Sequence, residues 1–200
     1  FELVQGEGGV MPLERAFVDC MAELAAEKDI LLVCDEVQTG NGRTGSLYAW
    51  QQYGFTPDIM STAKGLGGGL PIGACLFGEK TENTLTPGTH GSTFGGSPAV
   101  CAGALSILGR IDEALLAQVR AKSEYLFSAF EGKPGIEQVS GLGLMIGLKT
   151  AKPAAEVVAK CMEQGVLVLT AHGKVRLLPA LNIPMELVKK AAEVIIAACA

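Results

Sequence analysis

The sequence predicts an α/β protein with a sizeable buried core. Hydrophobic residues make up 48% of the 200 residues, charged residues 18%, and the mean hydropathy is positive. This composition excludes a disordered chain. Residues 30–34 form an uninterrupted apolar run, which is typical of a strand buried on both faces of a parallel sheet. Helical periodicity alternates with further short apolar runs, the order expected of an α/β fold.

The first half of the chain predicts short strands joined by glycine-rich loops. A strand over 2–5 ends at a run of glycines, and a helix is expected over 13–28 because apolar residues from Phe17 to Ala25 recur at three- and four-residue spacing. Further expected elements are the strand 30–34, a short aromatic helix around 47–53, strands over 57–62 and 73–77, and a loop over 88–98 rich in Gly, Ser and Thr.

The second half predicts a helix-rich stretch followed by an α+β segment. We place a domain boundary inside the helical stretch, which divides the chain into domains 1–105 and 106–200. The expected elements are helices over 98–111 and 113–130, strands over 136–139 and 144–149, a helix over 153–164, strands near 166–169 and 175–178, and a helix over 184–200.

Charge and cysteine usage exclude several function classes. The net charge is −5, the isoelectric point is near 5.1, and no run of Lys or Arg exceeds two residues, so neither a nucleic acid nor an anionic membrane is expected as a partner. Six scattered cysteines without a CxxC pattern favour free thiols in a reducing cytoplasm over disulfides or a metal site. Because the chain starts at Phe1 instead of Met, we expect a piece of a longer protein.

Two residues that come after predicted strands are candidates for chemistry. Asp35 ends the apolar run 30–34, where a carboxylate either caps a turn or faces a cationic ligand at the carboxyl edge of the sheet. Gln38 would flank the same crevice or lie solvated in its loop. Lys64 lies between Ala63 and a run of glycines. It is either a surface charge or a desolvated amine able to form a Schiff base with a carbonyl.

A glycine-rich loop supplies possible anion donors. Residues 90–97 offer hydroxyls and backbone N–H groups before a helix, which suits either a phosphate or carboxylate cradle or an ordinary turn capped by Ser97. Pyridoxal phosphate would join these parts, since it needs a lysine for its aldehyde, a carboxylate for its ring nitrogen and donors for its phosphate. Asp35, Lys64 and the loop around Thr93 supply all three.

Motifs along the whole chain resemble the class III (subgroup II) pyridoxal-phosphate aminotransferases. Two of them, the loop 88–96 and the strand 141–147, are most similar to the members that act on N-acetylornithine. The matching segments are 4–9 (VQGEGG), 35–40 (DEVQTG) with 42–45 (GRTG), 57–59 (PDI), 63–69 (AKGLGGG) with 71–74 (PIGA), 88–96 (GTHGSTFGG), 141–147 (GLGLMIG) and 175–176 (VR).

The resemblance implies the fold type I of pyridoxal-phosphate-dependent transferases: part of a large mixed or parallel-sheet domain over 1–105 and a small C-terminal α+β domain over 106–200. It implies that Lys64 binds the cofactor's aldehyde and shuttles a proton, and that Asp35 pairs with the ring nitrogen.

It further implies that Val37 packs on the ring and Gln38 approaches its phenolic oxygen. Ser92 and Thr93 would contact the phosphate of a neighbouring subunit's cofactor, so a homodimer is expected. Finally, Arg176 would bind a substrate carboxylate, with Glu7 as its gate.

The implied function is transfer of the terminal amino group of N-acetylornithine to 2-oxoglutarate in arginine biosynthesis. Alternatives are an ornithine, succinylornithine or 4-aminobutyrate aminotransferase, an aminomutase on the same scaffold, or a non-catalytic dimerisation fragment. Leu3 and Ser97 replace a common proline and asparagine of the family. The family's N-terminal half, which contributes phosphate donors and a ring-stacking aromatic, is absent, so only the C-terminal portion is expected here.

Overall fold

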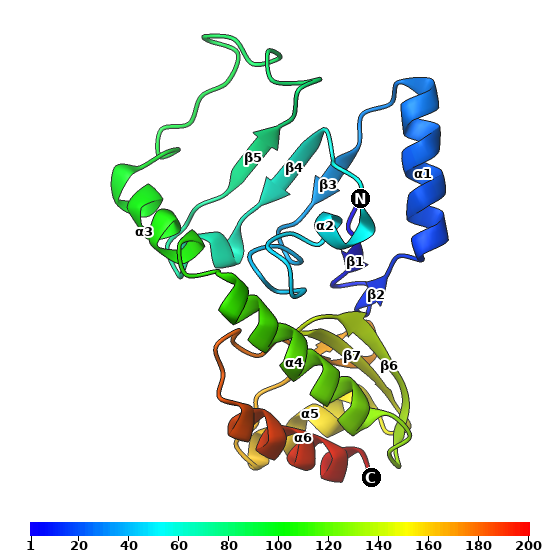
Figure 1. The fold of residues 1–200 in the computed structure, drawn as a ribbon. Helices are drawn as coiled ribbons and strands as arrows, with labels where there is room; N and C mark the ends of the chain where they lie inside the picture. The colour runs from blue at the N-terminus through cyan, green and yellow to red at the C-terminus, as the bar shows by residue number, and fades with distance from the viewer. The chain divides into compact units, whose positions relative to one another are not determined.

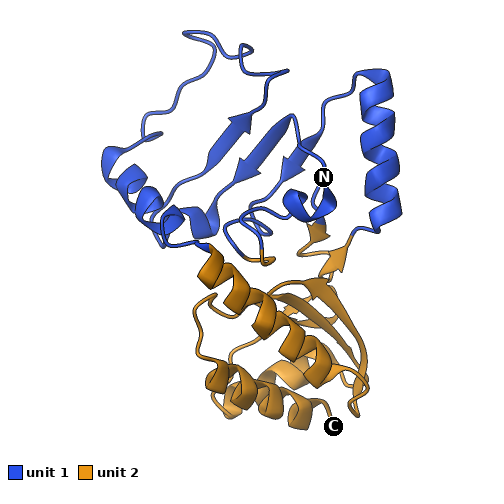
Figure 2. Cartoon of the chain, in the orientation of Figure 1, with its two compact units in different colours: residues 1–3, 13–42, 46–112 blue, residues 4–12, 43–45, 113–200 orange.

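The computed structural model describes residues 1–200 and divides into two units (Figure 1, Figure 2). The boundary expected near residue 105 differs from this division, because the chain leaves the first unit between Asp112 and Glu113. Helix α3 (Pro98–Leu108) packs on the 3₁₀ helix η1 (Lys64–Gly67) and so stays with the first unit. The first unit comprises 1–3, 13–42 and 46–112, and the second comprises 4–12, 43–45 and 113–200.

A mixed three-stranded sheet forms the centre of the first unit. Its strands are β3 (Val33–Asp35), β4 (Ile59–Thr62) and β5 (Ala74–Phe77), in the order β3-β4-β5. The pair β3–β4 is parallel and the pair β4–β5 is antiparallel. In Figure 1 the strands lie side by side. The carboxyl ends of β3 and β4 therefore meet at one edge of the sheet.

One face of β3 is less buried than the sequence predicts. Only Cys34 is buried, in a cluster with Leu3, Val18 and Ala49. Leu31 and Val33 are 45% and 46% exposed, so the expectation of a strand buried on both faces is wrong for this chain. The apolar run 30–34 shows that these side chains are hydrophobic, but within residues 1–200 no second layer of structure covers the face that carries Leu31 and Val33.

Two helices contribute to the first unit's core. Helix α1 (Arg15–Lys28) confirms the helix predicted over 13–28, but Val18 and Ala25 are its buried side chains and Phe17 is exposed. The short helix α2 (Trp50–Tyr53) confirms the aromatic helix in shortened form. The apolar periodicity thus predicted the helix correctly and only part of its buried face.

The second unit is an antiparallel sheet with helices packed against it, as expected of an α+β segment. Its core includes Phe130, Leu148 and Ile195. In order along the chain, the elements are α4 (Glu113–Phe130), β6 (Ile136–Leu142), β7 (Met145–Thr150), α5 (Ala154–Glu163), β8 (Leu169–Ala171), β9 (Lys174–Leu177) and α6 (Met185–Cys199), with sheet order β6-β7-β9-β8.

A small hairpin from the start of the chain also belongs to the second unit. It pairs β1 (Val4–Gln5) with β2 (Met11–Pro12). Strand β2 contacts β6, and Val4 and Val10 are fully buried with Met145. The sequence predicted the first strand but not the second, which is only two residues long. The hairpin places the turn 6–9 on the sheet.

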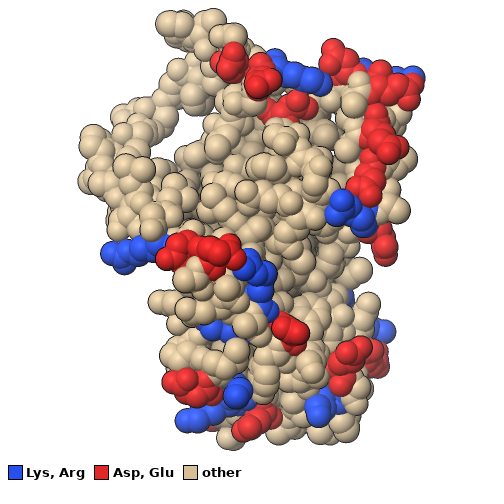
Figure 3. All heavy atoms as spheres, in the orientation of Figure 1, with Lys and Arg blue, Asp and Glu red and all other residues tan.

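The surface carries mixed charge on the face shown in Figure 3, where acidic and basic side chains are interspersed and form no continuous basic stripe. None of the helices combines the length and the apolar composition that are needed to cross a bilayer.

Candidate functional site

The carboxyl edge of the parallel pair brings Asp35 and Lys64 to one end of the sheet. Asp35 is the last residue of β3 and is the register partner of Ser61 in β4. Strand β4 ends at Thr62, and η1 begins at Lys64. Because β3 and β4 are parallel, both functional candidates follow the same edge, where ligands bind in open α/β sheets.

Asp35 is held by two donors on one of its oxygens. Its Oδ1 accepts the backbone N–H of Val37 at 2.9 Å and the hydroxyl of Ser61 at 3.0 Å. These bonds fix the side chain and leave Oδ2 for a further donor, although Asp35 itself is exposed. Ser61 was not singled out from the sequence, since only the strand register reveals it as the partner of Asp35.

Lys64 starts a tight turn in an unusual backbone conformation. Its φ is 49°, in the left-handed region that side chains with a Cβ seldom adopt. Lys64 is exposed within residues 1–200, as in the surface-charge alternative. The strained position directs attention to the residue, because such strain concentrates at functional sites.

Glu36, next to Asp35, is a buried carboxylate that sequence reasoning missed. It is fully buried and accepts hydrogen bonds from the hydroxyl of Thr39 and from the N–H of Trp50, the latter at 2.9 Å. Burial raises its pKa above the usual value, against the lowering effect of these bonds. Burial also raises the pKa of the Cys34 thiol to about 12, with Glu36 adding to the shift. Glu36 thus anchors the start of the loop that follows β3.

The remaining candidates of the first unit lie in loops. Val37 and Gln38 are half-buried just beyond Asp35. Ser92 and Thr93 are exposed in the long loop before α3, where the Ser92 hydroxyl accepts the N–H of Gly95 at 3.0 Å. Ser97 occupies the N-cap position of α3, but its side chain makes no capping bond. The loop is therefore open to a ligand or a second chain.

In the second unit, Arg176 and Glu7 form an ion pair. The Nη1 of Arg176 donates to Oε1 of Glu7 at 2.6 Å. The arginine side chain is only 10% exposed and the glutamate side chain is 73% exposed. The Nε of Arg176 is buried without a hydrogen-bond partner. A permanently charged, buried guanidinium requires an anion, and a solvent-exposed carboxylate is one that another carboxylate can replace.

Gly147 explains how the hairpin reaches this arginine. It is the register partner of Arg176 in the neighbouring strand. A Cβ at Gly147 would lie 2.9 Å from the Cβ of Val10 and 3.2 Å from the carbonyl oxygen of Gly9. Only glycine lets the hairpin that carries Glu7 approach the sheet so closely beside Arg176.

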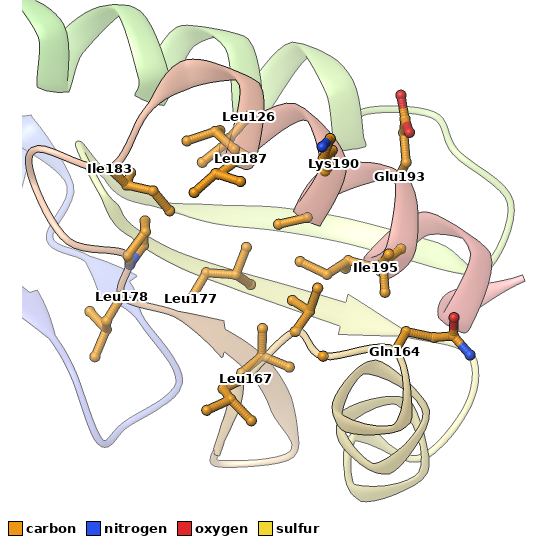
Figure 4. Close-up of a pocket in the computed structure, with 17 residues that line it drawn as sticks. Leu126, Gln164, Leu167, Leu177, Leu178, Ile183, Leu187, Lys190, Glu193 and Ile195 are labelled. Atoms are coloured by element: carbon orange, nitrogen blue, oxygen red, sulfur yellow. The ribbon is translucent and has the colours of Figure 1, made fainter.

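A cavity of about 650 Å³ in the second unit lies away from these residues. Leu177, Leu187 and Ile195 point into it in Figure 4, and its lining is largely apolar. None of the candidate site residues lines it. A cavity without convergent polar groups is a weak candidate for the chemistry that the sequence predicts.

A family model for class III aminotransferases matches residues 1–199. The chain belongs to that family. The acetylornithine aminotransferase of Haemophilus ducreyi is 46% identical over 196 residues, which cover 97% of this chain and 50% of that protein. The Aquifex aeolicus enzyme of the same name is 43% identical over 195 residues, covering 97% of this chain and 51% of that protein. The chain thus spans about half the length of these curated relatives.

Solved structures agree with this assignment. The ornithine aminotransferase of Toxoplasma gondii is 34% identical with a TM-score of 0.92, covering 99% of this chain and 50% of that one. The N-acetylornithine aminotransferase of Stenotrophomonas maltophilia is 37% identical with a TM-score of 0.87. That match covers 98% of this chain and 54% of the other. These matches confirm the expected fold type I of pyridoxal-phosphate-dependent transferases and the expected cofactor of the family.

The residues at the sheet edge fit pyridoxal phosphate. The cofactor needs an amine for its aldehyde and a carboxylate for its ring nitrogen, and Lys64 and Asp35 follow the same edge with their side chains exposed. The donors to Asp35 act on Oδ1, so the carboxylate is oriented and Oδ2 remains available to a protonated nitrogen.

Proposed function

We propose that this chain supplies the lysine-bearing half of an aminotransferase that transfers the terminal amino group of N-acetylornithine to 2-oxoglutarate, a step of arginine biosynthesis. The observation that carries the proposal is the placement of Asp35 and Lys64 at one edge of the parallel pair β3–β4, in a chain of this family. Three relatives of this chain, from Haemophilus ducreyi, Aquifex aeolicus and Archaeoglobus fulgidus, are named acetylornithine aminotransferases, which supports the choice of amine.

Lys64 is the proposed catalytic residue. When bound, pyridoxal phosphate supplies an aldehyde for an amine and a ring that accepts an electron pair. Nζ of Lys64 would hold the cofactor through its aldehyde and, once released by a substrate amine, would serve as the base and acid that moves the substrate's proton. Oδ2 of Asp35 would accept from the protonated ring nitrogen and keep it protonated. Val37 and Gln38, just beyond it, are proposed to contact the ring.

Arg176 and Glu7 are the proposed substrate-binding residues. Arg176 binds a carboxylate in a bidentate manner, and Glu7 occupies the guanidinium while an amine substrate without that carboxylate is present. The burial of Arg176 and the exposure of Glu7 support this exchange, because the arginine needs an anion at all times while the glutamate is readily solvated.

We further propose that the enzyme is a cytoplasmic homodimer. Ser92 and Thr93 would then contact the phosphate of the neighbouring subunit's cofactor. The exposure of the loop that holds them, in which Phe94 is 89% exposed, supports a partner at this surface. We assign the first unit to the large cofactor-binding domain and the second to the small domain, and the chain to the C-terminal portion of the enzyme.

A comparison of amine substrates tests the proposed reaction. In the complete enzyme, kcat/KM for N-acetylornithine should exceed that for ornithine, N-succinylornithine and 4-aminobutyrate, with 2-oxoglutarate as acceptor. A value for the acetylated amine no higher than that for ornithine would refute the choice of substrate. Loss of all four activities in Lys64→Ala is expected whichever amine is preferred.

A second candidate is that these 200 residues alone form a non-catalytic dimerisation piece. The exposure of Lys64 favours it, since the chain by itself leaves the amine in water. Pyridoxal phosphate added to the chain should then give weak or no visible absorbance from a lysine-linked cofactor. A strong band that disappears in Lys64→Ala would show that the chain alone holds the cofactor.

A further inference from the structure

Asn41 is a buried amide in the loop between β3 and α2. It is 5% exposed, and its φ of 55° lies in the left-handed region, which asparagine tolerates better than most residues with a side chain. The family assignment and the resemblance gave this residue no role. Its position in the loop brings it against the end of β4.

The side chain of Asn41 binds the two residues that precede Lys64. Its Nδ2 donates to the hydroxyl oxygen of Thr62 at 3.0 Å and to the carbonyl oxygen of Ala63 at 3.1 Å. A carbonyl oxygen only accepts hydrogen bonds, so the amide nitrogen and not the amide oxygen must face Ala63. The opposite atom, Oδ1, is buried without a partner, so the amide is oriented by its two donor bonds alone.

The same carbonyl begins the turn that displays Lys64. The oxygen of Ala63 also accepts the N–H of Leu66 at 3.0 Å, which closes the first turn of η1 around Lys64. On the other side of Lys64, a Cβ on Gly65 would lie 3.3 Å from the Cβ of Asn41. Asn41 therefore hydrogen-bonds the residue before Lys64 and lies close to the residue after it.

These contacts explain how an unfavourable backbone is held. A left-handed conformation costs energy for any residue with a Cβ, and it persists only where surrounding contacts impose it. At Lys64 one side chain, that of Asn41, hydrogen-bonds the preceding carbonyl and lies beside the following residue. Thr62, whose hydroxyl also accepts from Asn41, connects this side chain to the end of β4.

We propose that Asn41 is a positioning residue for Lys64, whose amide holds the Ala63 carbonyl and thereby fixes the left-handed turn from which the lysine amine projects. The inference rests on the proposed function only for the role of Lys64. The hold on the turn is a separate property of the chain and is measured separately.

The main variant is Asn41→Gly, which keeps the freedom for a positive φ and removes the amide. Asn41→Asp has nearly the same shape, also tolerates this φ, and lacks both donors. The matched control is Thr81→Val. Thr81 is 4% exposed and donates to the Asp58 carbonyl oxygen at 3.0 Å, so the control also removes buried hydrogen bonding from the first unit.

Thr81 follows β5, at the end of the sheet where Ile59 pairs with Phe77. Lys64 follows the opposite end of β4, next to the pair Thr62–Ala74. The control therefore weakens the same unit away from the lysine, and a general loss of stability will affect both sets of variants alike.

The first measurement is native-state hydrogen exchange at the Leu66 amide in the 200-residue chain. Exchange should be about tenfold faster in both Asn41 variants, the change expected from loss of one hydrogen bond, and unchanged in Thr81→Val. Equal exchange at Leu66 in wild type and in both Asn41 variants would overturn the proposal. So would equal acceleration in Thr81→Val, since the effect would then be general.

The second measurement, made on the complete enzyme, is trapping of pyridoxal phosphate on lysine by borohydride. Mass spectrometry reads it as the ratio of modified Lys64 to modified Lys133, which is exposed in this chain. The ratio should fall about tenfold in the Asn41 variants and stay unchanged in the control. An unchanged ratio in the Asn41 variants would refute positioning of the amine. If wild-type Lys64 is trapped no more than Lys133, the proposed function fails instead, and exchange at Leu66 alone decides the role of Asn41.

Discussion

Nη1 of Arg176 donates a hydrogen bond to Oε1 of Glu7 at 2.6 Å, and the two side chains differ sharply in burial. The arginine side chain is 10% exposed and the glutamate side chain is 73% exposed. Arg176 is therefore the fixed member of the pair, and Glu7 is the member that another carboxylate can replace. A carboxylate in contact with water loses little on leaving such a pair, while the guanidinium requires a new anion at once. This asymmetry suits alternate binding of substrates with and without a carboxylate at that position.

Glu7→Gln should favour substrates that bring a carboxylate to Arg176. Because the competing anion is removed, we expect a lower KM for glutamate and 2-oxoglutarate in the complete enzyme. Without these substrates the variant should lose folding stability, because the buried guanidinium is left without its counter-ion. Steady-state kinetics measures the first and urea unfolding the second. Glu137→Gln, which removes the surface partner of Lys149 in the same unit, should change neither KM.

Asp35→Asn should weaken cofactor binding while keeping the shape of the side chain. Loss of a charge-assisted hydrogen bond costs about 1.5–3 kcal/mol, or roughly 10- to 150-fold in affinity. Ser61→Ala removes only one of the two donors to Asp35 and should have a smaller effect. Titration of the complete enzyme with pyridoxal phosphate gives both values, and equal losses in the two variants would contradict the assigned role of Asp35.

Gly147→Ala should destabilise the second unit. The added Cβ would lie 2.9 Å from the Cβ of Val10, and overpacking of this kind costs about 1–3 kcal/mol. Gly91→Ala is the control, since a Cβ there meets nothing within 4 Å and its φ is not positive. Urea unfolding of the chain measures both. Stability equal to wild type in Gly147→Ala would show that the hairpin is not held against the sheet.

The pH dependence of stability should report Glu36. Burial raises the pKa of this carboxyl in the folded chain above its usual value, so the folded state binds more protons than the unfolded state in the interval between the two pKa values. The contribution of Glu36 to stability is therefore fully present below the unfolded pKa and is lost as pH rises through the folded one.

Glu36→Gln, which stays neutral, removes this dependence. Relative to the wild type, the variant should gain stability as the pH is raised from about 4.3, the unperturbed glutamate pKa, towards neutrality. Unfolding curves at a series of pH values measure the difference. A difference that does not vary with pH would mean that the folded and unfolded pKa values of Glu36 are the same.

Much of the secondary structure could be predicted because its signals are local. The helix expected over 113–130 is α4 itself, and the helix expected over 184–200 differs from α6 by one residue at each end. Strand β2 was missed, since two residues carry no periodicity. The exposed face of β3 was also missed, because an apolar run does not show whether a second layer is present to cover it.

The candidate site was predictable only in part, for a related reason. Asp35 and Lys64 stand out because each follows an apolar strand. Ser61, Glu36 and Asn41 do not, because each acts through a partner that only the strand register or the course of a loop brings near. A single sequence contains the residues of such pairs but not the pairing.

The interleaved course of the chain has a practical consequence for dissection. Residues 4–12 and 43–45 belong with 113–200, so no single cut in the polypeptide releases the second unit whole. A recombinant piece starting at Glu113 would lack the hairpin 4–12. The part of the sheet around Gly147 would then be exposed to solvent, and Arg176 would lose its counter-ion Glu7. An autonomous version would have to carry the early hairpin as a graft, joined through a designed linker.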